Sequence, residues 1–107
     1  MIISGGENVY SIEVEEAIAM HPAVLEAAVI GVPDDRWGER VHAVVALRPG
    51  GALTAQELRT HCRALIADFK CPRSMEIVDA LPRSSPGKVL KRQLREPYWA
   101  GADRQIH

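Results

Sequence analysis

The sequence predicts an α+β domain, with a small, mostly antiparallel sheet of about three strands covered by about three helices. Apolar residues recur at helical spacing in three segments, and stretches rich in valine, isoleucine and alanine lie between them. Turn residues follow these stretches. The length of 107 residues suits one domain, and because 47% of the residues are apolar the chain can bury a core.

The first helix is expected to begin at Ser11, a good N-cap residue, and to stop at Pro22. Its apolar residues recur at i, i+3, i+4 and i+7 spacing, and His21 lies at the end of this face. We interpret His21 as a packed or capping histidine and not as a catalytic base. The face consists of Val14, Ala17, Ile18 and His21.

Two strands are predicted next. Residues 24–32 are rich in Val, Ile and Ala and predict a mostly buried strand, followed by turn residues at 33–35. Residues 41–47 carry two alternating apolar sets and end at the turn 48–51. Because the connection between the strands is short, we expect them to pair antiparallel. The first strand is expected to place on one face the side chains of Leu25, Ala27 and Val29.

The second helix begins with a capping box formed by Thr54 and Glu57, and it is expected to end before Pro72. Cys62 lies on its apolar face and is expected to be a small buried hydrophobe. Cys62 and Cys71 lack the spacing of a metal site, and nothing requires a disulfide between them, so a reduced cytoplasmic setting is the default. The predicted inward stripe consists of Leu58, Cys62, Leu65, Ile66 and Phe69.

A short third strand is expected at 75–78, and a last helix runs from about Lys88 until Pro97 ends it. We expect this helix to turn inward the side chains of Val89, Leu90 and Leu94.

Charge is nearly balanced overall, at −1, so no global field attracts the chain to nucleic acid or to an anionic membrane. Residues 83–95 nevertheless hold five basic side chains and no acidic one. A basic patch confined to one segment suits a small phosphate-bearing ligand better than a long polyanion. No apolar stretch reaches the length of a membrane span, and no signal peptide is expected.

Lys88 is the strongest candidate for chemistry. A positioned ammonium reduces the repulsion between a carboxylate and the phosphate that it attacks, and it stabilises charge in the transition state. Lysine suits this task because it is a compact point charge on a long stem. The alternative is a solvated surface lysine, but a cation gains little at the start of a helix, and this favours the functional interpretation.

The glycine loop at Gly5 and Gly6 is a second candidate. Such a pair can be a simple turn, or it can allow a thin ligand arm to approach the backbone closely. The loop lacks the G-x-G-x-x-G spacing, so a dinucleotide-binding site is rejected. Trp37 is either an anchor at a partner interface or a cover for the edge of the core.

Five motifs occur in a fixed order: IISGGENVY at 2–10, EVEE and HPAV within 13–24, GVPD and WGE within 31–39, FKCPR at 69–73 and LPRSSPGK at 81–88. Together they resemble the C-terminal (lid) domain of the adenylate-forming enzyme superfamily, of the acyl-CoA synthetase or fatty-acid–CoA ligase type. The resemblance covers residues 1–99, and we expect 100–107 to be a disordered tail.

The resemblance implies a domain of a larger enzyme, an acid–thiol ligase. Such enzymes use ATP with Mg²⁺ to convert a carboxylic acid into an acyl-adenylate, and then form a thioester with coenzyme A. Lys88 is implied as the adenylation lysine; Gly5, Gly6 and Glu7 as the lining of the pantetheine channel; and Asn8 as a neighbour of the nucleotide. The implied partner is a large N-terminal adenylation domain, without which the chain is expected to be inactive. The chain is accordingly expected to be an excised domain or a gene fragment.

Two other functions stay open at this point. One is a stand-alone interaction module that binds a phosphorylated partner or RNA through residues 83–95; steeply salt-dependent RNA binding would favour it. The other is the subdomain of a peptide synthetase that docks a carrier protein, which predicts a linker and a carrier domain downstream.

Overall fold

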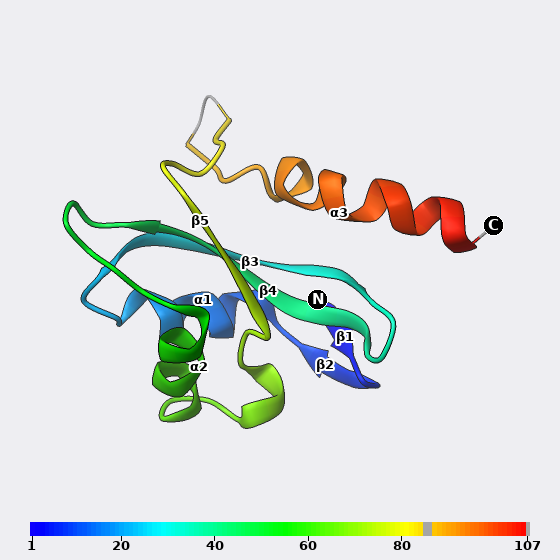
Figure 1. Ribbon diagram of the computed structural model, residues 1–107, viewed down its shortest axis with the longest axis horizontal. Coiled ribbons are helices and arrows are strands. Elements are labelled where there is room, and N and C mark those ends of the chain that lie inside the picture. The colour runs from blue at the N-terminus through cyan, green and yellow to red at the C-terminus, as the bar shows by residue number, and fades with distance from the viewer. Residues whose placement is uncertain (85–86, 107) are drawn as a thin grey trace.

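The computed structural model describes residues 1–84 and 87–106, with side chains as far as Ala100. It confirms the α+β class and the three expected helices (Figure 1). The elements are β1 (Ile2–Ser4), β2 (Glu7–Val9), α1 (Ser11–Ala19), β3 (Val24–Asp34), β4 (Gly38–Leu47), α2 (Ala55–Arg63), the 3₁₀ helix η1 (Asp68–Lys70), β5 (Ser74–Val78) and α3 (Lys91–Ile106).

The sheet is built around β4. Strand β3 pairs with it antiparallel from Val24 opposite Leu47 to Asp34 opposite Gly38. Strand β5 pairs with β4 in parallel, and β1 joins it where Ser4 lies opposite Gly38. The sheet is therefore mostly antiparallel, as expected, but the described residues form five strands, because the short strands β1 and β2 flank the glycine loop.

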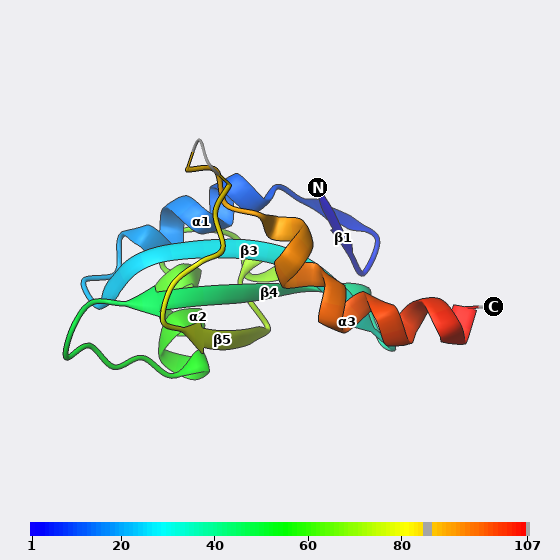
Figure 2. The same cartoon turned by 90° about the horizontal axis from the view of Figure 1, so that it is seen from above.

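Helices cover both faces of the sheet. Helices α1 and α2 lie on one face and α3 lies on the other, as Figures 1 and 2 show together. The sheet therefore divides the core into two clusters, of which the one under α1 and α2 has more buried side chains. The cluster under α3 is smaller and consists of Ala28, Ile30, Val32, Val44 and Leu81, with Val78, Val89, Leu94 and Tyr98 packed against it.

Strand β4 alternates as predicted but is buried on both faces, because it is the central strand. Val41, Ala43 and Val45 face α1 and α2, whereas Val44 faces α3. Strand β3 departs from its predicted alternation at Leu25, which is 52% exposed. The register between β3 and β4 shifts at this residue, so Leu25 does not share the inward face of Val29.

Ser11 is the first residue of α1, but its expected role as N-cap is wrong. Tyr10 occupies the N-cap position and makes no side-chain capping bond. The Ser11 hydroxyl instead accepts a hydrogen bond of 3.0 Å from Lys91 Nζ, at the start of α3.

The second helix has the predicted capping box: Thr54 Oγ1 accepts from the backbone N–H of Glu57, whose side chain accepts from the Thr54 N–H. Its expected continuation to Phe69 is wrong, because α2 ends at Arg63 and a turn and η1 follow. Leu65 and Phe69 are consequently exposed, whereas the other members of the expected stripe pack in the core.

The two cysteines are buried free thiols, as expected for Cys62. Burial raises the pKa of Cys62 to about 11 and also raises the pKa of Cys71. Since the thiolate is the nucleophilic form, neither side chain is activated for chemistry.

The last helix begins at Lys91, not near Lys88, because Val89 forms an antiparallel bridge with Arg83 that keeps the preceding backbone out of the helix. The expectation that Pro97 ends it is also wrong, since α3 continues to Ile106. A proline inside a helix costs one hydrogen bond, and packing of Leu94 and Tyr98 on either side of Pro97 holds the helix against the sheet. The disordered tail expected at 100–107 stays a prediction, since His107 and the side chains beyond Ala100 lie outside the described part.

Replacing Ile18 with alanine is expected to lower the free energy of unfolding by about 2–5 kcal/mol. Ile18 is fully buried between α1 and the sheet, so truncation removes apolar contacts and leaves a cavity. Urea unfolding followed by circular dichroism measures the change. Ile12→Ala is the matched control, because Ile12 lies on the same helix and is 65% exposed; equal losses in the two variants would contradict this packing.

Candidate functional site

Lys88 lies on a narrow loop between β5 and α3. The Lys88 carbonyl accepts a hydrogen bond of 2.9 Å from the Ser84 N–H, and the Pro82 carbonyl accepts one of 2.8 Å from the Leu90 N–H. The Gly87 N–H donates to the Ser84 carbonyl at 2.8 Å. Residues 82–84 and 87–90 therefore lie side by side; Ser85 and Pro86, part of the predicted turn, lie outside the described residues.

The base of this loop is fixed to the sheet by Arg83. Its guanidinium donates to the Gly87 carbonyl at 2.7 Å and pairs with the carboxylate of Glu26 on β3. The Lys88 side chain is exposed, and it makes no hydrogen bond or ion pair within the described residues. An ammonium held on an anchored loop without such a partner is available to an anion from outside the domain.

The glycine loop is a tight turn between β1 and β2. Ser4 pairs with Glu7, and the two glycines between them have positive φ angles of 60° and 84°. A two-residue hairpin with positive φ at both positions favours glycine strongly. The structure thus brings four predicted site residues, Gly5, Gly6, Glu7 and Asn8, together in one hairpin, and the last two are exposed on β2.

Trp37 packs directly against this turn. Its carbonyl accepts a hydrogen bond of 2.9 Å from the Gly5 N–H, and a Cβ on Gly5 would lie 2.7 Å from Trp37 Cε3. The space beside Gly6 is open, since a Cβ there would meet no described atom within 4 Å. Gly5 is therefore required by its neighbour, whereas Gly6 leaves its own surface accessible.

Arg73 completes this end of the domain. Its guanidinium carbon lies 4.2 Å from the centroid of the Trp37 ring, and its Nε is buried without a hydrogen-bond partner among the described residues. In the sequence, Arg73 is only one residue of the FKCPR motif, and the role of Trp37 stays open between an interface anchor and a cover for the core. The contact between Arg73 and Trp37 could not be predicted from the sequence, because the two residues lie 36 positions apart.

The loop that carries Trp37 is fixed by Asp34. Asp34 Oδ1 accepts hydrogen bonds from the backbone N–H groups of Arg36 and Trp37, at 2.8 and 2.9 Å. Mainly through the Trp37 N–H, these bonds hold the pKa of Asp34 below its ordinary value. A charged Asp34 thereby orders the wall beside the glycine turn.

The segment between β5 and α3, which carries Lys88, lies away from the β1–β2 hairpin (Figures 1 and 2). Ser4 pairs with Gly38 at one end of β4, and Glu26, which holds Arg83, adjoins Ala46 at the other end. Eight residues of strand at roughly 3.3 Å each separate these points by about 26 Å. The structure does not bring the two candidate groups to one point.

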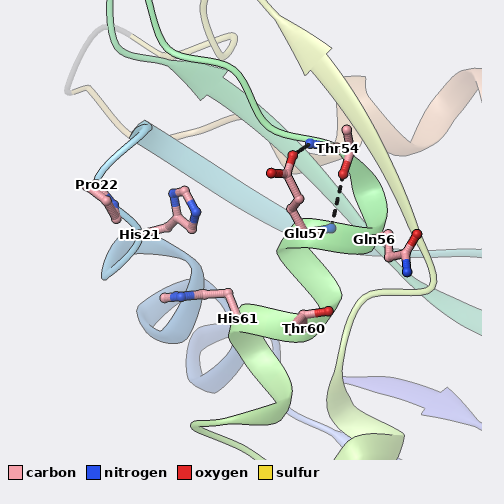
Figure 3. Close-up of a pocket in the computed structure, with 7 residues that line it drawn as sticks. All are labelled: His21, Pro22, Thr54, Gln56, Glu57, Thr60 and His61. Carbon is pink, nitrogen blue, oxygen red and sulfur yellow. Dashed lines mark hydrogen bonds between the residues drawn. The ribbon is translucent and has the colours of Figure 1, made fainter.

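A polar groove lies between the end of α1 and the start of α2 (Figure 3). His61 Nε2 donates to the Ala17 carbonyl at 2.7 Å, and His21 Nδ1 accepts from the Ala23 N–H at 3.1 Å. The two rings meet edge to face, with centroids 5.0 Å apart. The interpretation of His21 as a packed or capping histidine is confirmed, because both imidazoles bond to backbone at the end of α1.

Two further kinds of feature, a metal site and a membrane-spanning helix, are absent from the described part of the chain. It contains no group of three or more His, Cys, Asp or Glu side chains that could hold a metal ion. None of its helices combines the length and the apolar character needed to cross a membrane.

The fold and the two sites define a small three-layer α+β domain that presents an anchored cation at one end and a glycine hairpin at the other. The chain belongs to the family described as the AMP-binding enzyme C-terminal domain, which matches residues 13–88. This family is the one that the motifs predicted.

Individual relatives agree with this assignment. The chain is 42% identical over 99% of its length to a fatty acid–[acyl-carrier-protein] ligase of Streptomyces coeruleorubidus, covering 20% of that protein. It is 52% identical over 90% of its length to a 4-chlorobenzoate–CoA ligase of Pseudomonas sp., covering 18%. A solved acyl-CoA synthetase of Brucella canis superposes with a TM-score of 0.89 at 38% identity, over 94% of this chain and 19% of the other. The chain thus spans about a fifth of the length of the relatives it matches.

Proposed function

We propose that this chain, as residues 1–99, is the C-terminal lid of an ATP-dependent acyl-CoA ligase. The observation that carries the proposal is the pair of outward-facing sites, one cationic and one lined by glycine, that are anchored at opposite ends of β4. A reaction in two half-steps, first with a nucleotide and then with a thiol carrier, uses two such surfaces.

In the first half-reaction, a carboxylate attacks the α-phosphate of ATP and pyrophosphate leaves. Both reacting groups are anions, so Lys88 Nζ placed between their oxygens offsets the repulsion. Its exposed ammonium, unpaired within the described residues, fits that role. Those residues form no cluster that could hold a metal ion, so we assign none of them to the Mg²⁺ that accompanies ATP.

In the second half-reaction, a thiolate displaces AMP from the acyl-adenylate and forms a thioester. We assign Gly5, Gly6 and Glu7 to the wall of the channel that admits the pantetheine arm of coenzyme A. The open space beside Gly6 supports this assignment. Asn8, on the same hairpin, is assigned to the neighbourhood of the nucleotide.

One rigid domain cannot present both ends at a single reaction centre at once. A rotation of the whole domain about a hinge presents first the Lys88 loop and then the glycine hairpin. The large adenylation domain is the partner that this rotation requires. Both buried cysteines are free thiols, which suits the reducing cytoplasm to which we assign the enzyme.

The two alternative functions are not supported by the relatives. The carboxylate ligases named above match nearly the whole chain, and neither an RNA-binding module nor a peptide-synthetase subdomain is among them. The basic segment 83–95 is also not a continuous cationic surface, because Arg83 pairs with Glu26 and Lys91 with Glu15.

A chimera tests the proposal. The segment of the Pseudomonas 4-chlorobenzoate–CoA ligase that matches this chain is replaced by residues 1–107, and the product is incubated with 4-chlorobenzoate, ATP, Mg²⁺ and coenzyme A. We expect the CoA thioester to form. The ligase lacking that segment and the isolated chain are the controls, both expected to be inactive. A folded chimera without adenylate or thioester formation would count against the assignment.

A further inference from the structure

A line of polar side chains connects the sheet to α3 on the face opposite α1 and α2. Arg40 Nε lies 3.0 Å from Ser74 Oγ, and Ser74 Oγ lies 2.6 Å from His42 Nδ1. On the other side of the imidazole, His42 Nε2 lies 3.2 Å from the Tyr98 hydroxyl, which donates to Glu76 Oε1 at 2.8 Å. His42 is only 4% exposed, so these bonds replace its contact with water.

The chemistry of the two ends fixes the direction of the Arg40–Ser74, Tyr98–Glu76 and His42–Tyr98 bonds. Arg40 Nε can only donate, so Ser74 Oγ accepts from it, and the Ser74 hydroxyl hydrogen stays available to a neutral His42 Nδ1. The carboxylate of Glu76 can only accept, so the Tyr98 hydroxyl donates to it and accepts from His42 Nε2–H. The line is therefore complete when His42 is neutral with its hydrogen on Nε2.

A proton on His42 Nδ1 disturbs this arrangement. The Ser74 hydroxyl then loses His42 Nδ1 as its acceptor, and a buried imidazolium faces the Arg40 guanidinium. The charged and titratable groups around His42 are Arg40 on its own strand, with Asp34 3.5 Å from Arg40, Glu76 on β5 and Tyr98 on α3. Burial is the main cause that lowers the pKa of His42 below its ordinary value, and Arg40 adds to this effect while Glu76 opposes it.

Tyr98 is one of three polar anchors of α3 among the described residues; the others are Lys91 and Trp99, whose Nε1–H donates to the Gly31 carbonyl on β3 at 2.8 Å. Lys91 Nζ lies 2.7 Å from Glu15 Oε2 at the start of the helix, and Tyr98 follows two turns later at i+7. Leu94 packs between them against the core. Lys91 fixes the start of the helix, and Tyr98 and Trp99 together fix its middle; without the Tyr98 hydroxyl bonds, the middle is held only by Trp99 and by apolar packing.

Lys88 lies three residues before the first residue of α3. We propose that His42 and Tyr98 are positioning residues for Lys88: their directional hydrogen-bond line locks α3 on the sheet and thereby holds the loop that presents the ammonium. The role of the Lys88 ammonium rests on the proposed function. The attachment of α3 to the sheet by this hydrogen-bond line, called the lock below, is a property of the domain itself.

The lock is tested first on the 107-residue chain. Tyr98→Phe keeps the ring but removes two hydrogen bonds, one of them to a carboxylate, and it is expected to reduce the hydrogen-exchange protection of amides 88–100 by roughly tenfold. The matched control is Tyr10→Phe, because the Tyr10 ring is 59% exposed and its hydroxyl makes no hydrogen bond in the described structure; its protection is expected to stay at the wild-type value. Equal protection in the two variants, or an NMR spectrum that places the hydrogen of His42 on Nδ1 at pH 8, overturns the proposal.

The pH dependence of stability gives a second readout. Because the pKa of His42 is lowered in the folded chain, the unfolded chain binds a proton at this residue more readily than the folded chain does. The contribution of neutral His42 to the free energy of unfolding is therefore complete above pH 6.5. It is lost as the pH falls from 6.5 toward the folded-state pKa. The urea midpoint of the wild type is expected to fall between pH 7 and pH 5. His42→Gln is expected to show a smaller fall, whereas the control His61→Gln keeps the fall of the wild type. An undiminished fall in His42→Gln overturns the proposal.

The positioning role is tested in the active chimera. Tyr98→Phe is expected to slow adenylate formation roughly tenfold, because Lys88 is then correctly placed in a smaller fraction of molecules. Thioester formation from supplied acyl-adenylate is expected to stay unchanged. If adenylation by Tyr98→Phe is unaffected while Lys88→Ala still abolishes it, the positioning role is wrong and the proposed function stands. If Lys88→Ala has no effect on adenylate formation, the proposed function is wrong. The hydrogen-exchange experiment on the 107-residue chain then decides by itself whether the lock exists.

Discussion

Replacing Lys88 with alanine in the chimera is expected to slow acyl-adenylate formation about a thousandfold and to leave thioester formation largely intact. Two unit charges about 4 Å apart interact by roughly 4 kcal/mol at an effective dielectric constant of 20. Losing that stabilisation in the transition state lowers the rate by about three orders of magnitude. The second half-reaction keeps its rate because the opposite end of the domain serves it.

The measurement separates the two half-reactions. Carboxylate-dependent exchange of pyrophosphate into ATP reports the first, and a single turnover with synthetic acyl-adenylate and coenzyme A reports the second. Arg92→Ala is the matched control, since Arg92 is an exposed cation four residues away and is assigned no role. Equal loss of both half-reactions in Lys88→Ala would show that Lys88 supports the fold or the docking of the domain, not adenylation.

Replacing Gly6 with leucine is expected to give the opposite pattern, with thioester formation lost and pyrophosphate exchange retained. The new side chain extends into the space beside the hairpin that is free of described atoms, where the pantetheine arm is proposed to pass. A side chain at a φ of 84° also strains the backbone, by roughly 1–3 kcal/mol.

Gly50→Leu controls for that strain. Gly50 has a φ of 76° and open space at its Cβ position, but it lies in the turn after β4, away from the hairpin. Both variants are expected to lose similar stability, and only Gly6→Leu is expected to lose thioester formation. Unchanged thioester formation in a folded Gly6→Leu chimera would refute the channel assignment.

Long periodic segments allowed most of the fold to be predicted from sequence. The apolar spacing of α1, the alternation in β4 and the capping box of α2 each fix a local conformation, and all three are present. Strands β1 and β2 were missed because three residues are too few to show a period of two. The end of α2 was misplaced because Leu65 and Phe69 continue a helical spacing after the helix has stopped.

The candidate site was predictable where its residues are neighbours in the chain. Lys88 and the glycine pair stand out through their local context, and the structure adds that both are anchored and accessible. Contacts between distant residues left no such signal. Trp37 meets Arg73, and His42 meets Tyr98 across 56 positions, only because β4 lies between β5 and β3 and beneath α3.

The division of the core by the sheet also bears on how the domain opens. Helix α3 closes the smaller of the two clusters, so it has fewer buried apolar contacts to lose than the layer formed by α1 and α2. Cooperative units of this kind detach before global unfolding, in order of their local free energy. The segment that bears the proposed catalytic ammonium is therefore expected to separate before the layer of α1 and α2, and a sub-global fluctuation of this kind would withdraw that group from the reaction.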